Sequence, residues 1–199
     1  MRPSALRALA VILFPTILAI TGCDSVLTTA QLPSVREDGI LGDWKDLGTP
    51  GSTPQVDPVL IRFKDGEYAL GSPDDFAKGM ASRFTLARVG NVLIAESPGE
   101  GQCDVFGTEK AESCWSLNRV EVWPDRMNWY DFDASRLGRE SFGGSLNIAH
   151  SIRRQRKQDG SLETTVLLSA SSTELQRFLE SYVMRRGVFR LTGRLERLR

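Results

Sequence analysis

The sequence predicts a mainly β domain, built as an antiparallel meander with one α-helix before its last strand. Short apolar runs of strand length are separated by two-residue turn signals, and a capping box opens a single run with helical periodicity. Strands joined by such tight turns form hairpins, which favours antiparallel pairing over βαβ units. The turn signals are Asp65-Gly66, Gly90-Asn91, Pro124-Asp125 and Asp159-Gly160.

The first hairpins follow a loop over 48–58. Val59, Ile61 and Phe63 alternate with polar or outward positions before the turn at Asp65-Gly66. A short helix is expected from Ser72-Pro73, with proline at its first position. Further strand pairs are predicted over 83–89 and 92–96, over 114–123 and 126–132, and over 147–155 and 162–170.

The clearest helix begins after Ser171, which forms a capping box with Glu174. Its apolar stripe has helical spacing, and Gly187 can end it. A last strand follows. We expect Phe189, Leu191 and Leu195 to face inward, and Arg190, Arg194 and Glu196 to face outward.

The first 22 residues have the features of a secretory signal peptide. Arg2 and Arg7 give a positive start, and the apolar run over 8–20 is 13 residues long. That length is too short for a stable helix across a ~30 Å hydrocarbon core, and Pro15 interrupts it. We therefore expect residues 1–22 to be a leader rather than a permanent membrane span.

Ile20-Thr21-Gly22-Cys23 follows the apolar run directly and resembles the lipobox of bacterial lipoproteins. The resemblance implies that Cys23 is lipidated, becomes the first mature residue and anchors the chain in the cell envelope, facing the periplasm. More than one acyl chain gives stable anchoring, at about 0.8 kcal/mol per buried CH₂. Asp24 resembles the inner-membrane retention signal of enteric bacteria and so favours the inner membrane, but other bacteria read different positions, so the choice between inner and outer membrane stays open.

The rest of the chain divides into a tether over 23–38 and one domain over 39–199. Cys103 and Cys114 are then an even pair in an oxidising compartment, with ten residues between them. A disulfide closing this loop should stabilise the fold by about 2–3 kcal/mol. A redox pair usually shows C-x-x-C and a zinc site needs further ligands, so we favour the disulfide over both alternatives.

Gly42-Asp43-Trp44 lies in the first expected strand of the domain, and the C-terminal order is strand, helix, strand. Together these features resemble the lipocalin-like, or calycin, barrels, in which a G-x-W closes one end. The chain is also similar to uncharacterised bacterial lipoproteins that begin L-x-G-x-W, here Leu41 to Trp44, and end E-L-x-x-F-L, here Glu174 to Leu179. This resemblance implies a closed barrel but no particular activity.

Motifs of catalysis, cofactor binding and metal binding are missing from the sequence. His150 is the only histidine, and there is no G-x-S-x-G and no phosphate-binding glycine loop. Asp131-Phe-Asp133-Ala-Ser135 opens like a calcium loop but lacks the later glycine and glutamate, so we interpret its corner as a helix cap. We assign no catalytic, cofactor or metal residues. A formal net charge of zero argues against nucleic acid as a partner.

Two clusters allow more than one interpretation. Arg153, Arg154, Arg156 and Lys157 beside a hairpin tip are either a solvated surface or a contact for anionic lipid headgroups. Trp115, Trp123, Trp129 and Tyr130 either fill a core or line a cavity for an apolar ligand.

The function expected from these features is non-enzymatic binding or envelope assembly by a membrane-anchored domain. The partner would be an apolar small molecule inside the barrel or an envelope protein on its surface. An envelope hydrolase is the third class.

Replacing Cys23 tests the predicted anchor. Cys23→Ser should block acylation and leave the uncleaved precursor, because the lipoprotein peptidase requires the modified cysteine. Mass spectrometry of the membrane and soluble fractions measures both effects. Normal processing of the variant to a soluble product would contradict the lipoprotein prediction.

Overall fold

The computed structural model describes most of the chain after the predicted leader. Residues 1–22, Cys23 and Cys103 lie outside the described residues, so the signal peptide and the lipidation remain predictions. The described residues are 24–49, 57–99, 106, 114–144, 146–156, 160, 162–183, 185 and 187–199.

The described residues form eleven strands, three α-helices and one short 3₁₀-helix. The strands are β1 (Asp24–Thr28), β2 (Gly42–Asp46), β3 (Pro58–Lys64), β4 (Glu67–Gly71), β5 (Ser82–Val89), β6 (Val92–Pro98), β7 (Trp115–Val122), β8 (Arg126–Phe132), β9 (His150–Arg156), β10 (Leu162–Leu168) and β11 (Phe189–Arg197). The helices are η1 (Asp38–Ile40), α1 (Pro73–Lys78), α2 (Ala134–Phe142) and α3 (Ser172–Tyr182).

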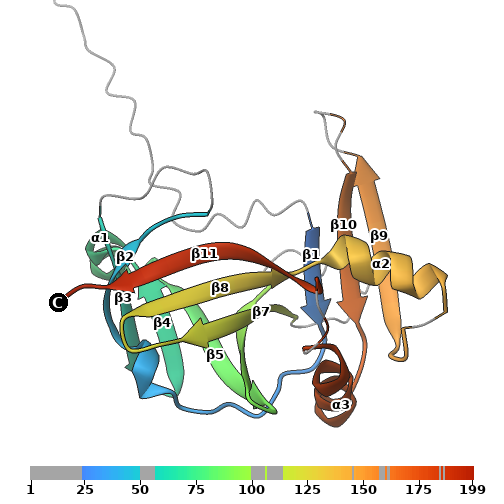
Figure 1. Cartoon of the computed structure of the whole chain (residues 1–199), viewed down its shortest axis with the longest axis horizontal. Helices are drawn as coiled ribbons and strands as arrows, with labels where there is room; N and C mark the ends of the chain where they lie inside the picture. Colours follow the sequence, from blue (N-terminus) through green and yellow to red (C-terminus); the bar gives the residue numbers. More distant parts are fainter. Residues whose placement is uncertain are drawn as a thin grey trace, which may run out of the picture.

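Eight of the strands close into an antiparallel barrel (Figure 1). Strands β2 to β8 follow one another as a meander, and β11 pairs with β8 on one side and β2 on the other. The closing pair aligns Arg197 with Trp44. This arrangement confirms the predicted mainly β barrel, with helix α3 before its last strand.

The turns between strands follow the sequence signals closely. Asp65 and Gly66 both have positive φ, 54° and 89°, and connect Lys64 directly to its partner Glu67. Positive φ at both central residues characterises the type I′ turn, whose twist matches that of a hairpin. Local turn chemistry therefore sets the register between β3 and β4.

Three strands extend the sheet beyond the barrel wall. Strand β1 pairs with the start of β7 and, in parallel, with β10, which pairs in turn with β9 (Figure 1). Residues 24–28, expected as part of a tether, thus form a strand in which Val26 and Leu27 are buried. A parallel partner far along the sequence leaves no local turn signal, so β1 was not predicted.

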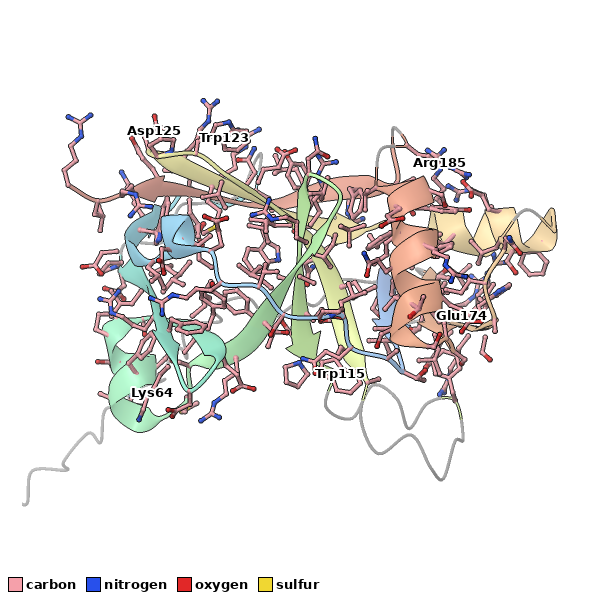
Figure 2. The ribbon with its side chains drawn as sticks, turned by 90° about the horizontal axis from the view of Figure 1, so that it is seen from below. Lys64, Trp115, Trp123, Asp125, Glu174 and Arg185 are labelled. Atoms are coloured by element: carbon pink, nitrogen blue, oxygen red, sulfur yellow. The ribbon has the colours of Figure 1, made fainter. Side chains whose placement is uncertain are left out.

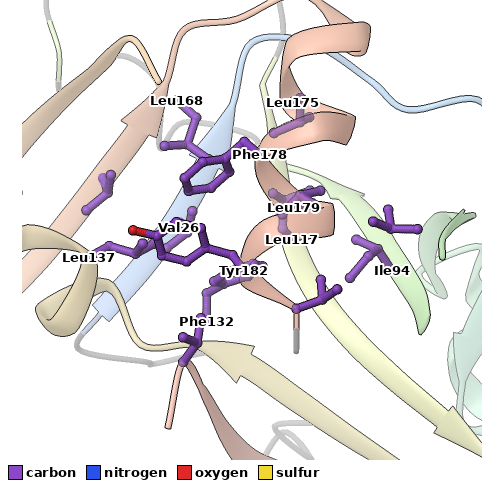
Figure 3. Packing of buried hydrophobic residues seen from close by; sticks show 14 of the residues in the cluster. Val26, Ile94, Leu117, Phe132, Leu137, Leu168, Leu175, Phe178, Leu179 and Tyr182 are labelled. Atoms are coloured by element: carbon purple, nitrogen blue, oxygen red, sulfur yellow. The ribbon is translucent and has the colours of Figure 1, made fainter. Parts of the chain in front are cut away.

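Helix α3 covers the outer face of this assembly rather than the barrel interior. Its apolar stripe packs with β1, β10 and α2 and against outward side chains of β5 and β6, such as Ala87 and Ile94 (Figure 3). The described residues thus form two large hydrophobic clusters, one outside the barrel wall and one inside it. The buried residues of α3 are Leu175, Phe178, Leu179 and Tyr182.

A β-bulge in β11 changes which side chains face the barrel interior. The register with β8 shifts between Leu191 and Gly193. Phe189 consequently packs on the outer cluster, beside Phe132, whereas Leu195 belongs to the inner one. The expectation that Phe189 and Leu191 face inward with Leu195 was wrong, because it assumed unbroken alternation and a bulge adds one residue.

The segment between β1 and β2 is fastened to the outer barrel wall. The Leu32 amide donates to both carboxylate oxygens of Glu96, at 3.0 and 3.1 Å, and the Val35 amide donates to Leu86 O at 2.6 Å. Glu96 is 1% exposed. Burial raises the pKa of Glu96 to about 7, although the hydrogen bond from Leu32 opposes the shift.

Glu96 should make the stability of the protein depend on pH. A raised carboxyl pKa means that the folded state binds the proton more tightly, so the stabilisation is complete below the ordinary value of 4.5 and is lost as pH rises through about 7. Across this window the free energy of unfolding should fall by about 3 kcal/mol relative to Glu96→Gln. Denaturant unfolding at several pH values measures the difference, and Glu196→Gln, on an exposed side chain, is the control.

Truncating the outer cluster should show how much it contributes. Phe178 is buried and stacks on Tyr182, with ring centroids 4.3 Å apart. Phe178→Ala should lower the free energy of unfolding by about 3–5 kcal/mol. Phe142→Ala, on the exposed side of α2, should change it by less than about 0.5 kcal/mol. Equal effects of the two substitutions in chemical unfolding would contradict this assignment of the core.

Candidate functional site

One end of the barrel is closed by Trp44 and Arg197. The Arg197 guanidinium lies 4.2 Å from the Trp44 ring centroid and donates to Leu41 O at 2.8 Å and Pro124 O at 2.7 Å. Trp44 Nε1 donates to Ile40 O at 2.9 Å. A fully buried tryptophan under a stacked arginine covers the barrel core at this end, next to a second pocket between η1, β6 and β7.

The middle of the barrel is filled with side chains. Leu86, Leu93, Val120 and Met127 belong to the inner cluster, and Phe84 meets Trp129 edge-on at 5.5 Å. These side chains fill the barrel between its two ends.

A cavity of about 530 Å³ lies at the opposite end, where β4, β6 and β8 end and β5 and β7 begin. Its walls combine aromatic and aliphatic side chains with several hydroxyl groups. Residues Ser25 and Val26 of β1 also line it, because β1 pairs with the part of β7 that β8 does not reach. The lining residues are Ser25, Val26, Leu70, Gly79, Met80, Ala81, Ser82, Arg83, Phe84, Ser97, Pro98, Ser116, Leu117, Asn118, Trp129, Asp131 and Phe132.

Three polar residues form a hydrogen-bonded group inside this end of the barrel. Asn118 and Asp131 are register partners on β7 and β8, and Asn118 Nδ2 donates to Asp131 Oδ1 at 2.7 Å. Thr192, in the bulge of β11, donates to the same oxygen at 3.0 Å. We call Asn118, Asp131 and Thr192 the polar floor.

The polar floor carries unused hydrogen-bonding capacity. Asn118 Oδ1 is buried and has no partner among the described residues. Both hydrogen bonds that Asp131 accepts from described side chains go to Oδ1, which leaves its second oxygen to a ligand or to solvent. Burial raises the pKa of Asp131, while Thr192, Arg190 and Asn118 oppose that rise. The second oxygen of Asp131 thus offers an acceptor to a group that can donate, whereas Asn118 Oδ1 is covered by protein atoms.

The mouth of the cavity is built from the segment between α1 and β5. Capping by Ser72 and Asp75 fixes where α1 starts, and Gly79 ends the helix with a φ of 68°, so that the segment to β5 follows. Met80 follows, lines the cavity and is 61% exposed. Met80, Ser82 and Arg83 therefore give the entrance one apolar and two polar side chains.

Of the aromatic cluster predicted on the β7–β8 hairpin, only Trp129 lies in the barrel. Tyr130 follows it in the strand, points outward and donates to Glu121 at 2.7 Å. Trp115 and Trp123 lie at opposite ends of β7 (Figure 2). The aromatic lining expected from the sequence is therefore provided by one of the four residues, joined by Phe84 and Phe132.

The cysteines predicted to pair are only partly described. Cys114 is buried, in a small cluster with Leu27 and Leu167. Cys103 lies outside the described residues, so the disulfide stays a prediction.

The histidine and the calcium-like segment have local roles. His150 contacts Ile148 O through Nδ1 at 2.7 Å and Ser141 Oγ through Nε2 at 2.5 Å, which links the end of α2 to the start of β9. Asp133 caps α2 by accepting from the Arg136 amide at 2.8 Å. Within the described ranges no cluster of three or more potential metal ligands occurs.

The two most buried carboxylates, Asp131 and Glu96, do not form a pair. Asp131 faces the barrel interior, whereas Glu96 lies on the outer wall beneath Leu32. A glycosidase-type mechanism needs two carboxyl groups flanking one bond. Among the described residues, the cavity is lined by a single carboxylate, Asp131.

The polar floor was not predicted, although the sequence contains a signal for it. Asn118 and Val120 share one face of β7, and Asp131 and Trp129 share one face of β8. A polar residue among apolar residues on the inward-facing side of a strand is the sequence signal for such a position.

Among the residues that the structure describes, no helix has both the length and the apolar character needed to cross a membrane.

Comparison with known proteins found no matching family model, and no curated protein or solved structure of significant similarity.

Proposed function

We propose that this chain is a lipid-anchored envelope protein that binds a small amphiphilic molecule in the open end of its barrel. The observation that carries the proposal is the cavity, whose lining combines three aromatic side chains with the Asp131 carboxylate of the polar floor. A cavity lined by apolar groups with a few convergent polar groups is the common form of a small-molecule site. The closure of the other end by Trp44 supports the likeness to lipocalin-like barrels.

The chemistry of the polar floor favours a ligand with a donor group at its buried end. The second oxygen of Asp131 can accept hydrogen bonds, and a carboxylate prefers a cationic donor. Trp129, Phe84 and Phe132 offer an apolar wall to the rest of the molecule. We infer a primary amine, or a similar cationic head, on a short apolar body.

The position of the cavity fits delivery from a membrane. Ser25 lines the cavity and is two residues after Cys23, the predicted lipidation site. An anchor at Cys23 would hold the cavity close to the bilayer surface. A membrane-derived or membrane-soluble amphiphile would then meet the cavity at high local concentration.

Calorimetric titration with three probes of equal length tests the proposal. Octylamine should bind more tightly than octanol or octanoate, because only the amine carries a cationic donor. Asp131→Asn should weaken octylamine binding by about ten- to a hundredfold, since hydrogen bonds to charged groups contribute about 1.5–3 kcal/mol. The affinity for octanol should change little.

Asp125→Asn is the matched control, because it removes the same charge at the closed end of the barrel (Figure 2). It should leave all three affinities unchanged. Melting curves of both variants verify folding. If octylamine does not bind, or if Asp131→Asn weakens all probes equally, the proposed ligand chemistry is wrong.

A further inference from the structure

The three-strand extension carries a surface that combines arginines with exposed apolar side chains. Leu162 pairs with Arg156 and Thr164 pairs with Arg154 across β9 and β10. Thr164 contacts α2 through Ser135, so the even-numbered residues of both strands share the face that α2 covers. Arg154 and Arg156 thus lie on one face together with Leu162.

Helix α2 adds two more exposed residues to this surface. Phe142 is 74% exposed, and the Arg154 guanidinium lies 4.7 Å from its ring centroid. Arg139 is also exposed and precedes Phe142 by one helical turn. Leu162 is 53% exposed. We call Arg139, Phe142, Arg154, Arg156 and Leu162 the basic-apolar patch.

The charge of the patch differs from that of the protein. Without Arg2 and Arg7 the chain has 23 basic and 25 acidic residues, a slight net negative charge. The carboxylate next in sequence to Leu162, Glu163, faces the other side of β10. Glu140 of α2 is engaged by Tyr182 and Arg136. Three arginines therefore face one surface without an opposing carboxylate from the described parts of these elements.

The register of β1 places the patch beside the predicted anchor. Asp24, the residue after Cys23, aligns with Thr164, which aligns in turn with Arg154. Neighbouring strands lie about 4.8 Å apart, so Asp24 and Arg154 are two strand spacings from each other. Leu162 and Arg156 are two residues beyond them along their strands. An acylated Cys23 and the patch would then meet the same bilayer surface.

We propose that the basic-apolar patch docks on the anionic headgroup surface of the membrane that holds the anchor. The arginines attract anionic phospholipid, and Phe142 and Leu162 enter the interfacial region, where apolar side chains next to cations are stable. An anchor at one residue would hold only one point of the domain and would leave its orientation undetermined. The patch gives the domain a fixed face toward the bilayer. This inference rests on the proposed anchoring at Cys23.

Vesicle co-sedimentation of a chain that begins at Asp24 tests the patch without the anchor. Every described helix and strand, and both hydrophobic clusters, lie within 24–199, so this chain retains the whole described fold. It should sediment with phosphatidylcholine vesicles that contain phosphatidylglycerol, but not with pure phosphatidylcholine. Added salt should weaken the binding. Because the protein is net negative, this binding requires a local basic surface.

The variant Arg154→Gln/Arg156→Gln should lose about 30-fold in affinity for the anionic vesicles, since each basic residue near such a surface contributes about 1 kcal/mol. Phe142→Ser should weaken binding at both low and high salt. The matched control is Arg36→Gln/Arg62→Gln, which removes two exposed arginines elsewhere on the barrel. Arg36 stacks on Phe63 at 4.8 Å, much as Arg154 stacks on Phe142.

Two outcomes would overturn the inference. The first is that the chain beginning at Asp24 does not sediment with anionic vesicles at low salt. The second is a control variant that loses as much affinity as the patch variant, which would mean that overall charge controls the binding. Neither outcome depends on octylamine binding or on acylation of Cys23, so failure of the patch is distinguishable from failure of the proposed function.

Discussion

The pairing of β11 with β2 is the constraint on which the rest of the architecture depends. It joins the last strand to the first strand of the barrel, and it brings Arg197 over Trp44. There the guanidinium also donates to carbonyl groups of η1, of Leu41 and of the β7–β8 turn. Without this pair both strands would be open edges, which invite association with other chains. The cavity with the polar floor lies at the opposite end of the barrel, which is the end proposed to admit the ligand.

The early end of the β7–β8 pairing creates both the cavity and the extension. Strand β8 pairs with β7 only from Asn118 onward, and β1 occupies the vacant edge at Trp115 and Ser116. Residues of β8 and β1 on either side of this divergence line the cavity. Strand β1 also pairs with β10, which pairs with β9. A single divergence between two strands therefore couples the proposed ligand site to the strand that follows Cys23. The outer cluster beneath α3 holds this coupled unit together.

Turn and cap residues made much of the fold predictable from the sequence. The strand pairs between distant segments could not be predicted in this way. Asp65-Gly66 and Gly90-Asn91 encode their hairpins within two residues, and the Ser171–Glu174 capping box marks where α3 starts. The parallel pair of β1 and β10 joins residues such as Ser25 and Thr165, which are 140 positions apart. No turn signal near either strand predicts this pairing. The bulge at Leu191–Gly193 reverses which side chains of β11 face the barrel interior. It was also unpredictable from local sequence, because it depends on the register between β11 and β8. Asn118 was overlooked although it alternates with the strand residues in step with Val120; its pairing with Asp131 follows only from the register of β7 and β8.

The polar floor is hard to explain by folding alone. A buried acceptor without a partner costs about 1–3 kcal/mol, which is a large share of the ~5–15 kcal/mol that stabilises a typical domain. Val120, two residues along the same face of β7, shows that an apolar side chain fits this wall. The chain nevertheless keeps an amide at Asn118 beside a carboxylate whose ionisation is opposed by burial. Apolar contacts distinguish similar ligands weakly, whereas buried polar groups reject molecules that leave them unpaired. We therefore infer that the donor group of the ligand, more than its apolar body, determines which molecules the cavity selects.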